Sequence, residues 1–229
     1  MEVRNIAVKV EPAIEQNRIR RQLVSAYYYA NKQPEGSTQP FTVEVESGAA
    51  LLIKLQQISD GFIHDGEGTY AHVKSNKANR LKELCAELVN SGEKVLVWTA
   101  FRKTTEILAS ILPYKTVRLT GDRPFDHETW RKGNAEICLA TVGSGASLND
   151  FQDVRYAIFY SCRYSHLNYQ QAKGRTDRKS SKHSIAYYYH MASVGFPDQD
   201  VYEMLDKSAK AEEYVIRTTT KLLANNDYV

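Results

Sequence analysis

Long hydrophobic runs are missing from this sequence. No apolar stretch approaches the roughly 18 residues that a membrane-spanning helix needs. The first residues, Met1 to Arg4, mix apolar and charged side chains and do not begin a signal peptide. The sequence therefore predicts no membrane partner and a cytoplasmic protein, which would act in a host cytoplasm if a virus encodes it.

Cysteine is scarce. The three cysteines, Cys85, Cys138 and Cys162, are odd in number, scattered, and without the spacing of metal ligands. We expect buried, inert thiols in a reducing compartment. His64 and His72 are accompanied by neither a cysteine pair nor an H-x-x-x-H pattern, so the sequence predicts solvated loop histidines and no metal site.

The chain also lacks a phosphate-binding loop of the G-x-x-x-x-G-K-[ST] type. No predicted strand ends in an acidic pair that could hold Mg²⁺. We therefore expect that the chain by itself does not hydrolyse ATP. The net charge of +3 is small, so only the placement of basic residues can indicate a nucleic-acid partner.

What is present is the composition of an ordinary globular protein, with 42% hydrophobic and 25% charged residues among 229. This length allows one large domain, or one domain with an appendage. Residues 1–73 read as a smaller segment of a strand, helices and loops, with the strand at 3–10. Residues 74–229 read as a separate α/β domain.

The α/β pattern consists of short apolar runs that alternate with amphipathic helical patterns. The clearest strands are KVLVWT at 94–99, ICLAT at 137–141 and VRYAIFY at 154–160. Residues 169–178 and 198–218 are predicted as helices. Such alternation predicts a mainly parallel sheet sandwiched by helices.

Four informative loops follow the predicted strands of this domain. They begin at Ala100, Thr120, Val142 and Ser161. In open α/β sheets, functional groups gather just beyond the carboxyl ends of the strands. The sequence therefore predicts one functional edge of the sheet.

Two arginines stand three residues apart behind a glycine, in the run QQAKGRTDR at 170–178. If the run is helical, Arg175 and Arg178 share one face and can point at a single target. Guanidinium groups match phosphate oxygens, and one aimed at a transferring γ-phosphoryl group accelerates its transfer by roughly 10³ to 10⁵. The alternative interpretation is a solvated basic helix face.

In order and spacing, these segments resemble the second RecA-like lobe of superfamily 2 helicases, above all the Swi/Snf-type branch and its compact bacterial and phage members. KVLVWTAF resembles motif IV, LATVGSGASLN motif V and QQAKGRTDR motif VI. Ser75-Asn76-Lys77 is similar to the branch's S-x-K element, and residues 119–122 to its L-T-G-D turn. The resemblance covers residues 74–217 and extends more weakly over 1–73.

The resemblance implies half of a catalytic site. Arg175 and Arg178 would reach across to ATP on a partner lobe, and Gln171 would bridge the two lobes. ATP and Mg²⁺ would be held mainly by that N-terminal ATP-binding lobe, in the same polypeptide or in trans. The glycines that would allow close approach to the cofactor are Gly143, Gly145 and Gly174. For the first two, a plain strand-to-helix turn is the alternative.

The resemblance also implies part of a track for DNA, with RNA as the alternative substrate. The residues along it would be Thr99, Arg102, Lys103, Thr120 and Thr141. For Thr99 and Thr120, ordinary turn capping is the competing interpretation. The chain departs from the family in two places: Lys179-Ser180-Ser181 follows Arg178 where motif VI usually continues as R-I-G-Q, and Asp150 ends motif V. We expect the Asp150 side chain to point away from the phosphates.

The functional prediction is the C-terminal lobe of an ATP-dependent DNA helicase or translocase, inactive as an ATPase when alone. Two alternatives from other classes remain open. One is a stand-alone nucleic-acid-binding module, and the other is an interaction module that regulates a complete helicase.

Overall fold

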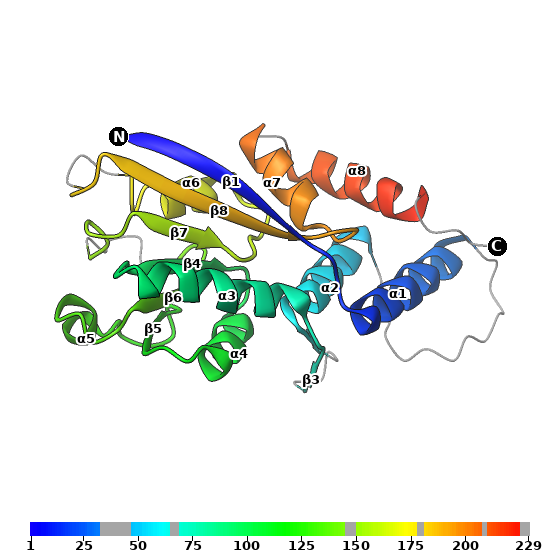
Figure 1. Cartoon of the computed structure of the whole chain (residues 1–229). Coiled ribbons are helices and arrows are strands. Elements are labelled where there is room, and N and C mark those ends of the chain that lie inside the picture. The colour runs from blue at the N-terminus through cyan, green and yellow to red at the C-terminus, as the bar shows by residue number, and fades with distance from the viewer. Residues whose placement is uncertain (33–46, 65–68, 145–149, 178–180, 208–209, 225–229) are drawn as a thin grey trace.

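The computed structural model describes residues 1–32, 47–64, 69–144, 150–177, 181–207 and 210–224 (Figure 1). Its centre is a six-stranded sheet in the order β1-β8-β7-β4-β6-β5, and every neighbouring pair is parallel. The strands are β1 (Glu2–Val10), β4 (Val95–Thr99), β5 (Thr116–Leu119), β6 (Ile137–Thr141), β7 (Tyr156–Phe159) and β8 (Ile185–Ser193). The predicted parallel α/β sheet is confirmed.

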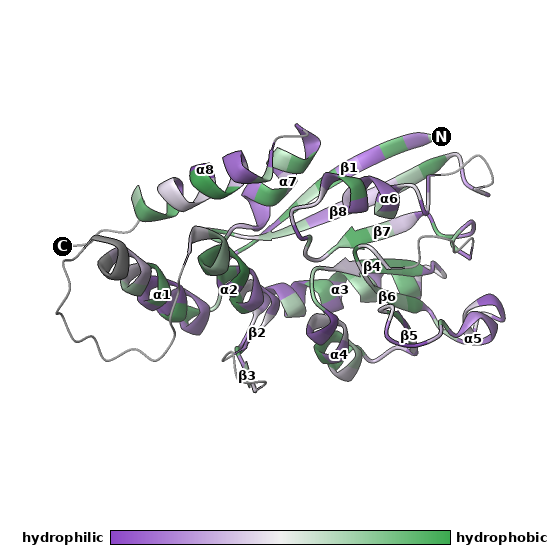
Figure 2. Ribbon diagram, turned by 180° about the vertical axis from the view of Figure 1, so that it is seen from behind, coloured by the Kyte–Doolittle hydropathy of each residue, from purple (hydrophilic) through white to green (hydrophobic). Residues whose placement is uncertain are grey.

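Helices cover both faces of the sheet, which is why its central strands are apolar up to their final threonines (Figure 2). In β4, Val95 and Val97 pack with α3 (Asn76–Asn90) and α4 (Arg102–Ile111). Leu96 and Trp98 face the opposite core, which includes α6 (His166–Lys173) and α7 (Asp198–Asp206). All five β4 residues are therefore buried, as expected for a strand covered on both sides.

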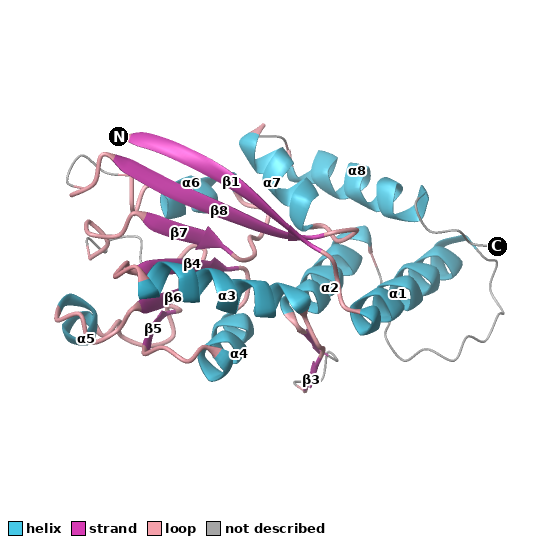
Figure 3. Ribbon diagram, in the orientation of Figure 1, coloured by secondary structure: helices cyan, strands magenta, loops and turns pink. Residues whose placement is uncertain are grey.

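The N-terminal segment contributes to the same sheet. β1 pairs with β8 along its whole length, from Glu2 opposite Ile185 to Val10 opposite Ser193. The helices α1 (Ile14–Lys32) and α2 (Gly48–Asp60) pack together and contact α8 (Ala211–Ala224) (Figure 3). Residues 1–73, which the sequence sets apart from the α/β domain, thus supply an edge strand of its sheet.

Two predicted helices differ from those observed. The predicted helix at 169–178 ends at Lys173, because the Gly174 amide closes the last turn on the Gln170 carbonyl at 2.9 Å and the Arg175 amide turns back to Ala172 at 3.2 Å. The expectation that Arg175 lies on a helix face is therefore wrong. The predicted long helix at 198–218 is divided into α7 and α8.

A small hairpin projects beside α4, formed by β2 (Phe62–His64) and β3 (Tyr70–His72). The helix α5 (His127–Arg131) follows β5. All three cysteines are buried and unpaired, as predicted. In the part of the chain that is described, no helix combines the length and hydrophobicity needed to cross a membrane.

Candidate nucleic-acid interface

Three predicted site threonines lie at the carboxyl edge of the sheet. Thr99 and Thr141 end the neighbouring strands β4 and β6 and are register partners. Thr120 directly follows β5, which pairs with β6 on its other side. Because all these strands are parallel, the loops that follow them meet at one edge.

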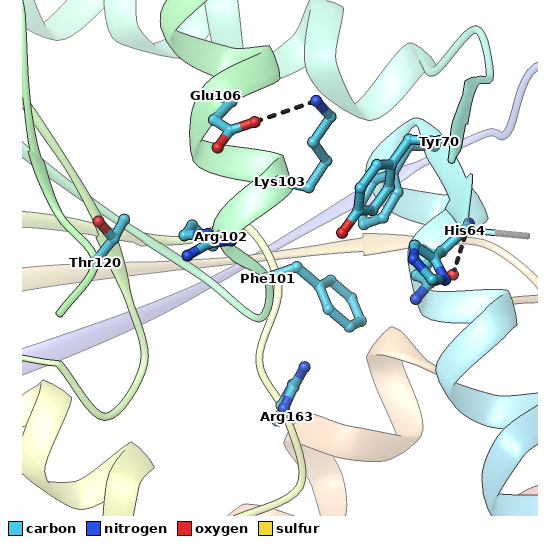
Figure 4. Close-up of a pocket in the computed structure, with 10 residues that line it drawn as sticks. His64, Tyr70, Phe101, Arg102, Lys103, Glu106, Thr120 and Arg163 are labelled. Atoms are coloured by element: carbon cyan, nitrogen blue, oxygen red, sulfur yellow. Dashed lines mark hydrogen bonds and ion pairs between the residues drawn. The ribbon is translucent and has the colours of Figure 1, made fainter. Parts of the chain in front are cut away.

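A pocket of about 530 Å³ lies at this edge, between the start of α4, the loop after β7 and the β2–β3 hairpin (Figure 4). Three of the five residues predicted to contact nucleic acid line it: Arg102, Lys103 and Thr120. The remaining lining residues are Gln57, Phe62, His64, Tyr70, Phe101, Glu106 and Arg163. The structure thus brings basic, aromatic and hydroxyl side chains from distant parts of the chain into one cavity.

The cations of the pocket differ in their partners. Lys103 Nζ lies 3.1 Å from Glu106, and Arg102 lies 3.5 Å from Asp122. Arg163 has no recorded ion pair among the described residues; its guanidinium lies 5.0 Å from the centre of the Phe101 ring. Arg163 was not among the predicted site residues, although its place in a loop after a strand could have identified it.

Thr99 and Thr141 are placed differently from Thr120. Thr99 is fully buried, and its hydroxyl has the Phe101 and Ala140 carbonyls within 3.1 and 3.3 Å. The Thr141 hydroxyl is bonded to that of Ser144 at 2.5 Å. In this conformation both hydroxyls close their own loops, and neither residue lines the pocket.

Gly143, in the loop after β6, lies where a side chain would not fit. Gly143 has φ +99°, and a Cβ there would stand 3.2 Å from the Asn168 amide nitrogen of α6. A side chain is therefore disfavoured both by conformation and by space. Gly174, by contrast, has φ −65°, which any residue can adopt. Gly145 lies outside the described residues.

The predicted catalytic residues lie on and after α6. Gln171 is exposed and shares one side of the helix with Leu167, which is 67% exposed. Arg175 follows the helix in a turn and is only 5% exposed. Arg178 lies outside the described residues. The structure therefore places Gln171 at the surface and Arg175 in the interior.

A buried ion network lies beneath the pocket, and sequence reasoning missed it. The Asp60 carboxylate accepts hydrogen bonds from Thr104 at 2.7 Å, from Ser161 at 2.6 Å and from Lys77 at 2.9 Å. All four side chains are fully buried. Asp60, Thr104 and Ser161 each lie within two residues of a pocket residue, so one carboxylate fixes three walls of the cavity.

Lys77 stays charged in this network. Its Nζ also lies 3.2 Å from Asp198 at the start of α7. Burial disfavours the charged form, but Asp198 and Asp60 outweigh it, so that the pKa of Lys77 is raised. Burial raises the pKa of Asp60, because it disfavours the charged carboxylate, and the positive charge of Lys77 opposes this shift. The network ties α2, α3 and α7 to the functional edge.

The Asp150 side chain is turned toward α5 and accepts bonds from His127 at 2.7 Å and Arg131 at 2.5 Å. Within the described residues, no group of three or more His, Cys, Asp or Glu side chains could hold a metal ion.

The sequence is similar to known helicases over part of its length. Residues 76–180 match the family model described as the helicase conserved C-terminal domain. The chain is 30% identical to the protein named "Putative ATP-dependent DNA helicase Q1" of Caenorhabditis briggsae over 112 residues, which are 45% of this chain and 18% of that protein. ATP-dependent DNA helicase Q-like 4B of Arabidopsis thaliana is also 30% identical over 112 residues, covering 45% and 10%. The match thus spans less than a fifth of these relatives.

Solved structures with the same architecture cover nearly the whole chain. The C-terminal part of the Fun30 ATPase domain superposes with a TM-score of 0.74 at 14% identity, over 96% of both chains. The Sulfolobus solfataricus SWI2/SNF2 ATPase core in complex with dsDNA gives 0.67 at 15% identity, over 99% of this chain and 48% of that one. At such identities the likeness shows a shared fold, a RecA-like lobe.

Proposed function

We propose that the chain is the second motor lobe of an ATP-dependent DNA helicase or translocase; the match of residues 76–180 to the helicase conserved C-terminal domain supports this. It supplies arginines and part of the nucleic-acid track, while a partner lobe holds ATP and Mg²⁺. The residues of its motifs favour the Swi/Snf-like branch, with its compact bacterial and phage members. Closure of the two lobes would complete the catalytic site.

The pocket at the carboxyl edge is the observation that carries this proposal. Arg102, Lys103 and Thr120, which the resemblance assigns to the strand track, line a single cavity in the structure. Charged and hydroxyl side chains at such a place suit phosphate oxygens and contact them without regard to sequence. Thr141 and the Gly143 amide lie at the same edge and would extend the track toward α6.

The nucleotide-facing arginines belong to the same proposal. Because Arg175 is 5% exposed, its turn would have to open before its guanidinium could reach a nucleotide on another lobe. We therefore assign the arginine finger first to Arg178. Gln171 is exposed on α6, which supports a contact with the partner lobe.

The finger is tested in the two-lobe protein by changing Arg178→Ala. DNA-stimulated ATP turnover should fall by roughly 10³-fold, about 4 kcal/mol of barrier, because no group then stabilises the transferring phosphoryl. Arg178→Lys should recover little, since an ammonium lacks the planar fork. Steady-state phosphate release measures both.

The matched control is Arg80→Ala on α3, where the arginine is half-buried and paired with Glu83 and Glu87. It should keep wild-type turnover. Turnover retained in Arg178→Ala would contradict the finger. A wild-type two-lobe protein that binds DNA without any ATP turnover would instead favour a binding module.

A further inference from the structure

The β2–β3 hairpin forms one wall of the pocket and lies outside the family match at 76–180. Its Tyr70 is 44% exposed. The Tyr70 ring lies 4.7 Å from the His64 ring and 5.8 Å from that of Phe62, and Lys103 Nζ lies 5.1 Å from its centre. The exposed ring is thus held in place from several sides.

The facing wall carries a second planar group. The Phe101 ring packs edge-on against Phe62 at 5.6 Å and supports the Arg163 guanidinium. Arg163 is exposed and has no recorded ion pair among the described residues. Figure 4 shows Phe101 and Arg163 facing the side from which Tyr70 and His64 enter.

We propose that this pocket binds one unpaired nucleotide of the DNA strand. Its base lies against Tyr70 and the Arg163 guanidinium, and its phosphate contacts Arg102 and Lys103. The proposal deepens the proposed function and rests on it, because it specifies which form of nucleic acid the lobe prefers.

Several observations favour a base together with its phosphate over a phosphate alone. A phosphate needs only cations, whereas this pocket is also lined by the rings of Phe62, His64, Tyr70 and Phe101, of which Tyr70 is 44% exposed. Bases stack on aromatic and guanidinium planes once they leave a duplex. The volume of about 530 Å³ also suits a small-molecule ligand, for which sites of roughly 300–1,000 Å³ are usual.

The test compares an oligothymidine with a blunt duplex of equal length, by fluorescence anisotropy at low salt with the whole chain. Tyr70→Ala should weaken oligothymidine binding roughly tenfold, the usual size of one lost stacking contact, and leave duplex binding within about twofold. Tyr70→Phe keeps the ring and should bind like wild type. Arg163→Gln should weaken oligothymidine binding more than duplex binding.

Tyr114→Ala is the matched control, because Tyr114 precedes β5 and lies at the opposite edge of the sheet. It should bind both ligands normally. Equal losses on both ligands, or no loss in Tyr70→Ala with wild-type circular dichroism, would overturn the nucleotide pocket while leaving the proposed function intact. If wild type binds neither ligand, the proposed function itself fails.

Discussion

His190 illustrates how the surroundings of one residue set its charge. Its Nε2 lies 2.8 Å from the Tyr169 hydroxyl, and its ring stacks on Phe159 with centroids 5.0 Å apart. Burial lowers the pKa of His190 to about 4, and Asp206 only partly opposes this. The imidazole is therefore neutral in the folded protein at pH values where it is charged in the unfolded chain.

This shift predicts acid-sensitive stability. Between pH 6.5 and about pH 4 the unfolded chain binds the proton that the folded protein excludes. The contribution of His190 to the free energy of unfolding is therefore fully present above pH 6.5. Below that pH it falls by about 1.4 kcal/mol per pH unit, about 3 kcal/mol in all. Urea unfolding across this range measures the slope.

Replacing the titrating group separates its contribution from that of other residues. His190→Gln should flatten the slope, whereas His72→Gln, on the exposed strand β3, should leave it as in wild type. Identical slopes in His190→Gln and wild type would show that His190 does not carry the effect.

At the residue scale, the sequence predicts which residues lie at the functional edge better than it predicts whether their side chains point into the pocket or into the interior. Thr99 and Thr120 both follow apolar strand runs, yet Thr99 is buried and Thr120 lines the pocket. Both faces of β4 are covered, so its last side chain has no route to solvent. Arg163 was missed because no motif marks it, and the ring that its guanidinium contacts, Phe101, is distant in sequence.

At the scale of elements, strands were predictable and helix ends were not. The apolar runs of β4, β6 and β7 identify strands buried on both faces. No glycine or proline separates α7 from α8, so nothing local marks the break between them. The packing of α8 against α1, α2 and α7 is a tertiary feature that sequence periodicity does not contain.

The contact between α2, α3 and α7 depends on the buried Lys77. Lys77→Met should lower the free energy of unfolding by about 3–5 kcal/mol, because Asp60 and Asp198 would be left buried without their cation. Denaturant unfolding at neutral pH gives this value. Adding Asp198→Asn should recover part of it.

The control on the same helix is Lys82→Met, whose side chain is exposed. It should change stability little, as surface substitutions usually do. If Lys77→Met unfolds at the denaturant concentration of Lys82→Met, the network contributes no net stability.

On the scale of the whole molecule, the fold class followed from the alternating pattern, but the pocket did not. Its walls come from residues 57, 62–64, 70, 101–106, 120 and 163, which only the folded sheet brings together. The hairpin and α2 belong to the segment that the sequence sets apart, while β1 completes the sheet. The pocket is therefore built from residues on both sides of Asn76, where the family match at 76–180 begins.

The charge of this edge predicts how the whole molecule responds to salt. A plot of the logarithm of the binding constant for duplex DNA against the logarithm of the salt concentration should be a falling straight line. The reason is that phosphates neutralised by basic side chains release counterions. Lys103→Gln removes one such contact, so its slope should be shallower by roughly 0.9. Anisotropy titrations over a salt series measure this. Lys82→Gln, exposed on α3 and away from the pocket, should keep the wild-type slope. A Lys103→Gln slope equal to that of wild type would place the phosphate track elsewhere on the lobe.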